Sequence, residues 1–535
     1  MSQRSVTLNR RQLFRAALGS LPLDQTLSVE PNVVLPPIST IALNRMGFGP
    51  SAGDVEAFDA LGADDVSRLQ AYIEQQLNPD AIDDSACDAR ITEAAFPTLN
   101  KSRTALWTDY KAVKGKAQSV PLKDMRRLKL LRAVHSKRQL VEVLAEFWHD
   151  HFSVDGSTKP VRSMITAYDR DVIRPNILGN FRTFLEANTK STCMLYYLDN
   201  VSNKKKGPNE NYARELCELH TLGEKAYLGP TEQQDVAGYP DAPIGYVEDD
   251  VFAIAKCFTG WSVANRASQG GTLGGFHYFA GRHDTSGKLV MGLTIPANQG
   301  EMQDGLDVLD RLAAHPATAH HIAYKLCRRL IHDFPPNDVV ESAAAVFIEK
   351  SAEADQLKHV VRHILQSNAF SSSWEGKFKR PFEAAVSTLR AIGADPSSYA
   401  KSNKHVNGTI NHIASGGQPL FDWSPPNGYP DVGAYWQGST GFVARWRMYN
   451  WLVFRLPDVN TVTPAELTTP NEIADFWLAR IFGYAISADD RNTIVTFFAD
   501  GGDPNTPMDR SKNKYITLIR AGVALILSTT QFQQR

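Results

Sequence analysis

Two short segments contain most of the side chains that could do chemistry. The first, AEFWHDHF, spans Ala145 to Phe152 and contains one glutamate, two histidines, one aspartate and three aromatic residues. The second, NENYARELCELHTLG, spans Asn209 to Gly223 and adds three glutamates, an arginine and another histidine. Carboxylates and imidazoles transfer protons and bind metals at neutral pH. The question is whether the fold brings the two segments together.

The first segment is predicted to form a helix with two different faces. Each residue of a helix advances by about 100° around the axis. One face is apolar and contains Leu140, Leu144, Phe147, Trp148 and His151. The opposite face contains Glu142, Glu146 and His149.

The E-x-x-H pair of Glu146 and His149 is a candidate metal site. A glutamate and a histidine one turn apart can both reach one metal ion, as they do in carboxylate-bridged di-iron helical bundles. These two residues are the predicted metal ligands, and a divalent metal is the cofactor they would hold, although the sequence has no second E-x-x-H motif. The alternative is a solvated polar face for Glu142, Glu146 and His149, with His151 as a hydrogen-bonded core histidine.

The second segment supplies the candidate catalytic groups. On a regular helix over 211–222, Glu215 and Glu218 share one stripe, whereas His220 lies nearly opposite. These groups can meet at one site only if the helix is distorted before His220, and Gly223 is a suitable cap for such an end. The predicted catalytic residues are Glu215, Glu218, His220, Arg214 and His151. The alternative is a surface helix with an Arg214–Glu218 ion pair.

Several further side chains are candidates for substrate binding. In GRHDTSGK, His283 and Asp284 occupy a glycine-flanked loop, where rigid neighbours can present them to a ligand. A simple turn held by the aspartate is the alternative. The predicted substrate-binding residues are Asn209, Asn211, Trp148, His283 and Asp284. Aromatic residues of the last third could stack on sugar rings or serve only as packing, namely Trp423, Tyr429, Trp436, Trp446 and Trp451.

Three cations gather in the segment HPATAHHIAYKLCRRLIHDFPP. Its opening His315-Pro316 is typical of a helix N-terminus, and the two final prolines end the helix. Lys325, Arg328 and Arg329 then lie in the last turns, where cations offset the helix dipole.

The periodicity of apolar residues predicts a mainly α fold, a large multi-helix domain with long Gly-, Pro- and aromatic-rich loops and at most a small β-hairpin. Apolar residues recur at steps of three and four over 66–77, 125–152, 211–222, 251–261, 305–314, 317–333, 339–351 and 357–366. The glycine-rich range 223–305 interrupts this pattern and contains the candidate hairpin. The predicted division is an N-terminal segment (1–37), a helical domain that carries the candidate site (38–400) and an aromatic-rich helical subdomain packed on it (401–535).

Composition and charge narrow the functional classes. Lys plus Arg total 57 against 58 for Asp plus Glu, which argues against a nucleic-acid partner. Five dispersed cysteines form no CxxC pair, so a disulfide framework and a thiolate zinc site are not expected. No apolar run is long enough for a transmembrane span. Arg10-Arg11 before a short apolar stretch resembles a twin-arginine export signal. A periplasmic or secreted location is predicted, with an amphipathic first helix in a cytoplasmic protein as the alternative.

Six motifs taken together resemble one bacterial family. They are LNRMGFGPS, EFWHDHF, NENYARELCELHTLG, CFTGW, HPATAHHIAYKLCRRLI with FPP, and GQPLFDWSPPNGYPD, in order between Leu43 and Trp446. This set is similar to the bacterial domain-of-unknown-function family number 1800. The resemblance implies a large, mostly helical bacterial protein, often with an export signal, and it implies no activity.

An exported hydrolytic enzyme that acts on a polymer such as a glycan is the leading hypothesis. Glu215 or Glu218 would act as general acid or base, and a nearby histidine would assist or bind a metal. One alternative is a helical oxidoreductase whose iron is held by Glu146, His149 and a carboxylate of the second segment. The other is a non-catalytic envelope or polysaccharide-binding protein, for which the aromatic last third is the argument.

Overall fold

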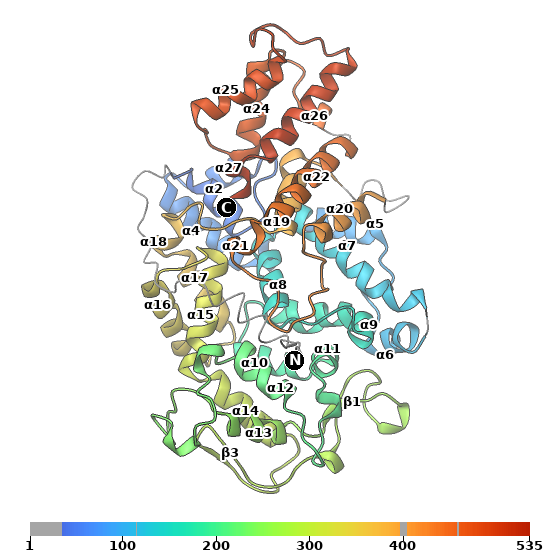
Figure 1. Cartoon of the computed structure of the whole chain (residues 1–535), viewed down its shortest axis with the longest axis vertical. Coiled ribbons are helices and arrows are strands. Elements are labelled where there is room, and N and C mark those ends of the chain that lie inside the picture. Colours follow the sequence, from blue (N-terminus) through green and yellow to red (C-terminus); the bar gives the residue numbers. More distant parts are fainter. Residues whose placement is uncertain (1–34, 114, 396–403, 457–458) are drawn as a thin grey trace, which may run out of the picture. The chain divides into compact units, whose positions relative to one another are not determined.

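The predicted mainly α fold is confirmed. The computed structural model describes residues 35–113, 115–395, 404–456 and 459–535. Helices dominate these ranges, and the strands form two small antiparallel pairs (Figure 1). Residues Pro36–Arg535 form one compact unit. The predicted division of this unit into a domain and a subdomain near residue 400 stays a prediction. The predicted export signal lies outside the described residues.

Helices α2 to α13 make up the first half of this unit. Their bounds are α2 (Ile38–Arg45), α3 (Asp54–Asp59), α4 (Asp65–Leu77), α5 (Ser85–Ala94), α6 (Arg103–Leu106), α7 (Val120–His135), α8 (Gln139–His151), α9 (Lys159–Tyr168), α10 (Phe181–Thr189), α11 (Thr192–Tyr197), α12 (Asn211–Glu215) and α13 (Glu248–Cys257). Across the described part of the chain, no helix is long and apolar enough to cross a membrane.

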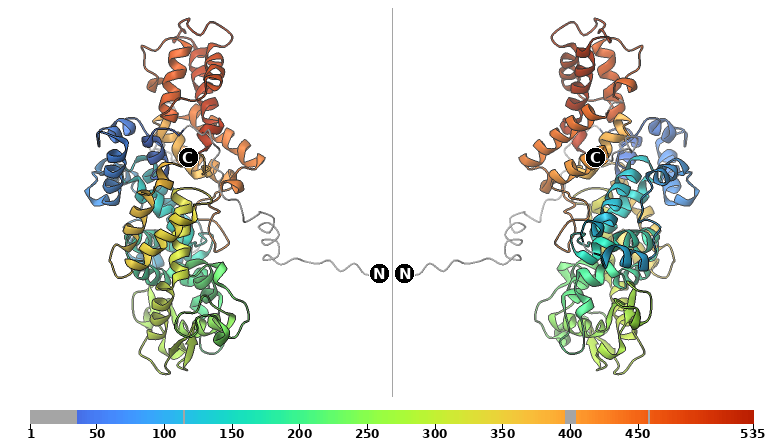
Figure 2. Two further views of the ribbon diagram at one scale, coloured as in Figure 1. Left: turned by 90° about the vertical axis from the view of Figure 1, so that its left-hand side faces the viewer. Right: turned by 90° about the vertical axis from the view of Figure 1, so that its right-hand side faces the viewer.

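Helices α14 to α27 make up the second half. Their bounds are α14 (Gln303–Ala313), α15 (Pro316–Leu330), α16 (Asn337–Glu349), α17 (Gln356–Leu365), α18 (Asn368–Ser371), α19 (Pro381–Ile392), α20 (Lys404–Ser415), α21 (Gly433–Trp436), α22 (Ser439–Arg455), α23 (Val459–Val462), α24 (Pro470–Phe482), α25 (Ala488–Ala499), α26 (Asn513–Leu527) and α27 (Thr530–Gln533). Helices α15, α16 and α17 pack together, and α22, α24, α25 and α26 form a second group (Figure 1 and Figure 2).

The prediction of one continuous helix over 125–152 is wrong in one respect. The structure has two helices there, α7 and α8. The chain leaves the helical conformation at Ser136, where φ is −67° and ψ is 138°. The Asp84 carboxylate fixes this break, since it accepts hydrogen bonds from Ser136 Oγ and from the Lys137 amide, both at 2.7 Å. A side chain that satisfies backbone groups in this way competes with the helical ladder.

The glycine-rich range 223–305 contains more β structure than the single hairpin that was predicted. Strand β1 (Trp261–Val263) pairs with β2 (Phe276–Tyr278), and β3 (Lys288–Val290) pairs with β4 (Leu293–Ile295), both antiparallel. The tight turn between β3 and β4 consists of Met291 and Gly292, whose φ values are 46° and 78°. Two consecutive positive φ values are characteristic of the turn that suits a two-residue hairpin.

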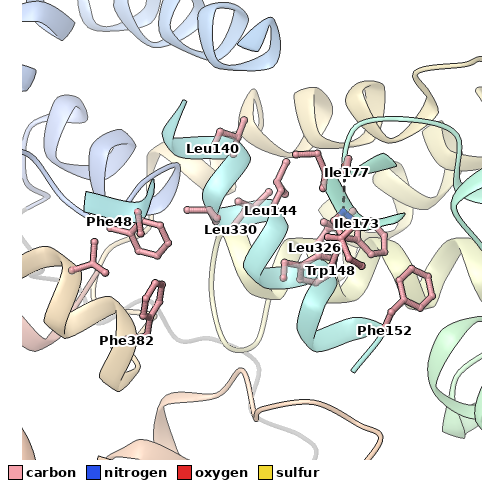
Figure 3. Close-up of a cluster of buried hydrophobic side chains, with 14 of the residues drawn as sticks. Phe48, Leu140, Leu144, Trp148, Phe152, Ile173, Ile177, Leu326, Leu330 and Phe382 are labelled. Carbon is pink, nitrogen blue, oxygen red and sulfur yellow. Dashed lines mark hydrogen bonds between the residues drawn. The ribbon is translucent and has the colours of Figure 1, made fainter. Parts of the chain in front are cut away.

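Helix α8 contributes its apolar face to the core, as predicted (Figure 3). Leu140, Leu144 and Trp148 have no solvent exposure, and Figure 3 shows them in a cluster with Leu326 of α15. The Trp148 Nε1–H donates to the Ile177 carbonyl oxygen at 3.2 Å. The predicted role of Trp148 in substrate binding is therefore wrong, because both its ring and its polar atom are used inside the core.

Candidate functional site

The polar face of α8 is buried, which excludes the solvated face that the sequence allowed. Glu142, Glu146 and His149 are 6%, 1% and 9% exposed. Burial of ionisable groups is costly unless each finds a partner. Each of the three side chains has such partners, and these come from distant segments of the chain.

His149 and Asp169 form a hydrogen-bonded pair. His149 Nε2 lies 2.9 Å from Asp169 Oδ1, in the π-helical turn Asp169–Ile173 that follows α9. A carboxylate oxygen can only accept a hydrogen bond. In the neutral imidazole of His149, Nε2 therefore carries the proton and Nδ1 carries the lone pair. Arg174 Nε donates to the other Asp169 oxygen at 2.8 Å, and its Nη atoms donate to both Glu142 oxygens at 2.8 Å. The carboxylate that orients the imidazole is thus itself held in place.

The electrostatics of this pair favour a neutral imidazole beside an ionised carboxylate. Burial lowers the pKa of His149 below its ordinary value, and the bond to Asp169 offsets this only in part. Burial alone would raise the pKa of Asp169, but Arg174, His149 and Arg132 hold it well below its ordinary value. At neutral pH, His149 Nδ1 can therefore act as a base.

A pocket opens beside His149. It contains about 400 Å³ of space, its open mouth included. Its lining residues are Lys129, His149, Asp150, Ser153, Val154, Gln418, Leu420, Phe421, Trp423 and Tyr429. Lys129 comes from α7, His149 and Asp150 come from the end of α8, and Ser153 and Val154 follow that helix. The others come from the aromatic-rich segment between α20 and α21. Two of the residues predicted as sugar-stacking candidates, Trp423 and Tyr429, thus line this pocket.

Asp150 is the carboxylate in the pocket lining. Its Oδ2 accepts from Arg380 Nη1 at 2.6 Å, and its side chain is 23% exposed. Burial raises the pKa of Asp150 above its ordinary value, and Arg380 and Lys129 offset this only in part. Asp150 and Asp169 therefore differ in acidity, which is the arrangement that lets two carboxylates take different roles.

Gly428 brings the aromatic wall of the pocket close to α8. Its φ is 70°, and a Cβ at this position would lie 2.0 Å from the Asp150 carbonyl oxygen. We expect Gly428→Ala to displace the wall and to destabilise the protein by about 1–3 kcal/mol, because backbone strain and a steric clash add. The measurement is the midpoint of thermal unfolding. Gly501→Ala is the control, since φ there is 80° but no described atom lies within 4 Å of a Cβ. Equal destabilisation of both variants would show that the contact with Asp150 has no effect.

Glu146 belongs to a buried ion network and not to a metal site. Its carboxylate lies 2.8 Å from Arg380 Nη2, 3.6 Å from Arg329 Nη2 and 3.8 Å from Lys129 Nζ. His149 bonds to a different carboxylate. Within the described ranges, no group of three or more His, Cys, Asp or Glu side chains is placed to hold a metal ion. The structure therefore does not support Glu146 and His149 as metal ligands, nor the iron enzyme based on them.

The network joins five cations to five anions. They are Lys129, Arg329, Lys377, Arg380 and Arg535 with Glu146, Asp150, Asp333, Glu383 and Asp431. Glu383, like Glu146, pairs with three cations, at 2.7 Å from Arg329, 3.4 Å from Arg380 and 3.2 Å from Arg535. Arg380 also binds Asp150, so the network supports the pocket directly.

The second segment is distorted at its end, where the helix departs from regular α-helical geometry. Helix α12 continues as the π-helical turn Leu216–His220, and Gly223 follows with a φ of 90°. His220 is completely buried, and its carbonyl oxygen accepts from His151 Nε2 at 3.2 Å. The two motif segments are therefore neighbours, and they meet through two of the predicted catalytic residues.

The predicted catalytic carboxylates of this segment lie outside the pocket beside His149. Glu215 and Glu218 are half-buried and are absent from its lining. Arg214 pairs with Glu248 at 2.6 Å and with Glu210 at 3.2 Å. The His149 and Asp150 side chains that line this pocket come from α8, and α12 contributes none of its lining.

Four predicted substrate-binding residues are held in local structure. Asn209 Oδ1 accepts from the Asn211 amide at 3.0 Å, at the start of α12. His283 is buried, with Nδ1 2.9 Å from the Thr259 carbonyl oxygen. Asp284 Oδ1 accepts from a backbone amide two residues further on at 2.9 Å, as in the predicted turn. These residues do not line the pocket beside His149.

Sequence reasoning missed Asp169, Lys129 and Ser153. Asp169 lies 20 residues after His149 and belongs to no motif with a characteristic spacing. The available signal was an acidic residue directly after the apolar run MITAY. Lys129 and Ser153 had no signal, since charged and hydroxyl residues are common on helices and at helix ends.

Comparisons with known proteins identify a family but no activity. A family model with the description "Protein of unknown function (DUF1800)" matches residues 41–534, nearly the whole chain. Searches of curated proteins and of solved structures found no match.

Proposed function

The chain belongs to the DUF1800 family, and from this starting point we propose that it is a hydrolase that acts on a saccharide polymer at the pocket beside His149. The family description names no activity. The observation that carries the proposal is the 2.9 Å hydrogen bond from His149 to Asp169, at the wall of a pocket that also contains Asp150 and aromatic rings.

The pocket residues have distinct roles in this reaction. His149 Nδ1 takes a proton from a water molecule as the water oxygen attacks the carbon of the scissile bond. Asp169 keeps the imidazole in the required tautomer and stabilises the imidazolium that forms. Burial favours the protonated form of Asp150. In that form, released from its ion pair with Arg380, Asp150 gives its proton to the leaving oxygen, so the carbon–oxygen bond breaks without releasing an alkoxide.

The aromatic wall supports a saccharide as the substrate class. The rings of Trp423 and Tyr429 have centroids 4.8 Å apart and are tilted by 45°. Trp423 Nε1 donates to Asn427 Oδ1 at 3.1 Å, which fixes the indole. Fixed aromatic rings with a few polar groups are typical of ligand pockets, and they present apolar faces to the C–H faces of sugars.

A non-catalytic saccharide-binding protein is the second candidate, because the same aromatic wall would serve it. The two proposals differ in what they require of His149, since a binding protein needs no base. Export to the periplasm or beyond the cell remains a prediction from the sequence and is compatible with both.

The experiment is a screen of the purified protein against a panel of bacterial and plant polysaccharides. Release of reducing ends and binding are measured on the same panel. We expect release from at least one polymer, and loss of this release with retained binding in a variant that carries His149→Gln and Asp169→Asn. Binding without release from any polymer would favour the binding protein and contradict the hydrolase.

A further inference from the structure

Three histidines and a lysine gather on another side of the end of α8, outside the lining of the pocket. His151 comes from α8, His220 from the π-helical turn, and His321 and Lys325 from α15. The ring centroids of His220 and His321 each lie 6.2 Å from that of His151. Three segments far apart in the sequence therefore place four nitrogen-bearing side chains in one cluster.

Lys325 has an imidazole as its partner. Its Nζ lies 2.9 Å from His151 Nδ1. His151 Nε2 must donate to the His220 carbonyl oxygen, because a carbonyl only accepts. Nδ1 then carries the lone pair, and Lys325 is the donor. Among the described residues, no carboxylate forms an ion pair with Nζ, and His151 is its hydrogen-bond partner.

The surroundings of Lys325 lower its pKa. Burial, together with the nearby Arg328, lowers the pKa of Lys325 to about 8, although Asp150 and Asp431 offset part of this effect. Burial and the nearby Lys325 also lower the pKa of His220 and that of His321 to about 3. At neutral pH the imidazoles are uncharged, and about one tenth of Lys325 is a free amine.

The ring of His220 provides a second indication of a ligand site, independent of the contact between Lys325 and His151. It is completely buried, and neither ring nitrogen has a hydrogen-bond partner among the residues that the structure describes. A neutral imidazole offers one donor and one acceptor, and leaving a buried polar group unpaired costs about 1–3 kcal/mol. Native proteins rarely accept this cost without a ligand or a water that fills the gap.

We propose that Lys325 is an amine nucleophile that binds small aldehydes or ketones covalently. The Lys325 nitrogen forms a bond to the carbonyl carbon, and the carbonyl π bond becomes a hydroxyl group. The proton that leaves Nζ passes through His151 Nδ1 to this oxygen, which the ring of His220 holds by a hydrogen bond. Loss of water from the carbinolamine then gives an imine. No oxidant or reductant takes part, and the inference does not rest on the proposed hydrolase.

Reductive trapping tests this site in the full-length protein. The protein is incubated with glycolaldehyde and sodium cyanoborohydride at pH 7, and modified lysines are quantified by peptide mass spectrometry. Lys204, Lys205 and Lys206 are exposed and serve as internal controls. We expect Lys325 to react about tenfold faster than these, because a pKa near 8 instead of about 10.4 raises its free-amine fraction more than burial slows it.

Two further measurements define the mechanism. The rate of trapping at Lys325 should rise with pH around a midpoint near 8 in the wild-type protein. His151→Gln should slow it about tenfold, whereas His320→Gln, at an exposed histidine of the same helix, should not. Trapping no faster than at the exposed lysines, or a midpoint near 10, would overturn the proposal. If His151→Gln does not fold, the pH profile of the wild-type protein decides alone.

Discussion

Replacing His149 with glutamine is expected to lower the rate of polysaccharide hydrolysis by about 10²- to 10⁴-fold, which is the usual cost of losing a general base. Glutamine retains a group that can donate to Asp169, so the pocket should keep its shape. Binding of the same polysaccharide should therefore change little. The measurements are the initial rate of reducing-end release and the dissociation constant.

Two variants control this experiment. His320→Gln changes an exposed histidine that pairs with Glu341 at 3.2 Å, and it should leave the rate unchanged. Asp169→Asn keeps the imidazole but removes the carboxylate that fixes its tautomer, so a large loss of rate is expected here as well. If His149→Gln hydrolyses the polymer at the wild-type rate, another residue is the base.

The pH dependence of the rate follows from the same imidazole. Burial lowers the pKa of His149 below its ordinary value, and only the neutral imidazole, present above that pKa, can take a proton. The rate should fall as the pH decreases through this pKa. Any residual rate of His149→Gln should lack this acidic limb in a pH–rate profile.

Glu383→Gln is expected to destabilise the protein by about 3–5 kcal/mol, the usual cost of removing one partner from a buried ion pair. The carboxylate is 2% exposed and lies among three guanidinium groups, from Arg329, Arg380 and Arg535. Without its charge, these cations are left with less compensation inside the protein. The measurement is the midpoint of thermal unfolding at neutral pH.

An exposed ion pair provides the control for Glu383→Gln. Asp475 pairs with Arg491 at 2.6 Å, and the two side chains are 53% and 36% exposed. Asp475→Asn should cost less than about 1 kcal/mol, because water and salt screen such pairs. Similar losses for Glu383→Gln and Asp475→Asn would show that the buried network contributes no more than a surface pair.

The pH dependence of this stabilisation has a definite sign. Burial alone would raise the pKa of Glu383, but the three arginines hold it well below its ordinary value. The stabilisation is therefore complete above the pKa of an unfolded glutamate, about 4.3, and is lost as the pH falls toward the folded pKa. The difference in stability between wild type and Glu383→Gln should persist at neutral pH and narrow below about pH 4.

Local sequence patterns predicted much of the fold because they determine local structure. The apolar stripe of α8 predicted the buried positions Leu140 and Leu144 correctly. The break at Ser136 was not predicted, because it depends on Asp84, far away in the sequence. The periodicity of apolar residues predicts which residues share a helix face. It cannot predict a long-range hydrogen bond that ends the helix.

The candidate site was predicted only in part, for a related reason. The sequence singled out both motif segments, and the structure brings His151 and His220 together. The polar face of α8 could not be assigned to the interior, because the arginines that neutralise Glu146 lie in α15 and just before α19. A charged stripe has the same sequence pattern whether water or distant guanidinium groups surround it.

A crystal structure of the Asp169→Asn variant with an oligosaccharide from the best polymer of the panel tests the central claim most directly. The account predicts a sugar ring against Trp423, and a water or the scissile bond within about 3 Å of His149 Nδ1. It also predicts that Asp150 lies next to the glycosidic oxygen. An oligosaccharide bound at another surface, with this pocket holding only solvent, would contradict the account.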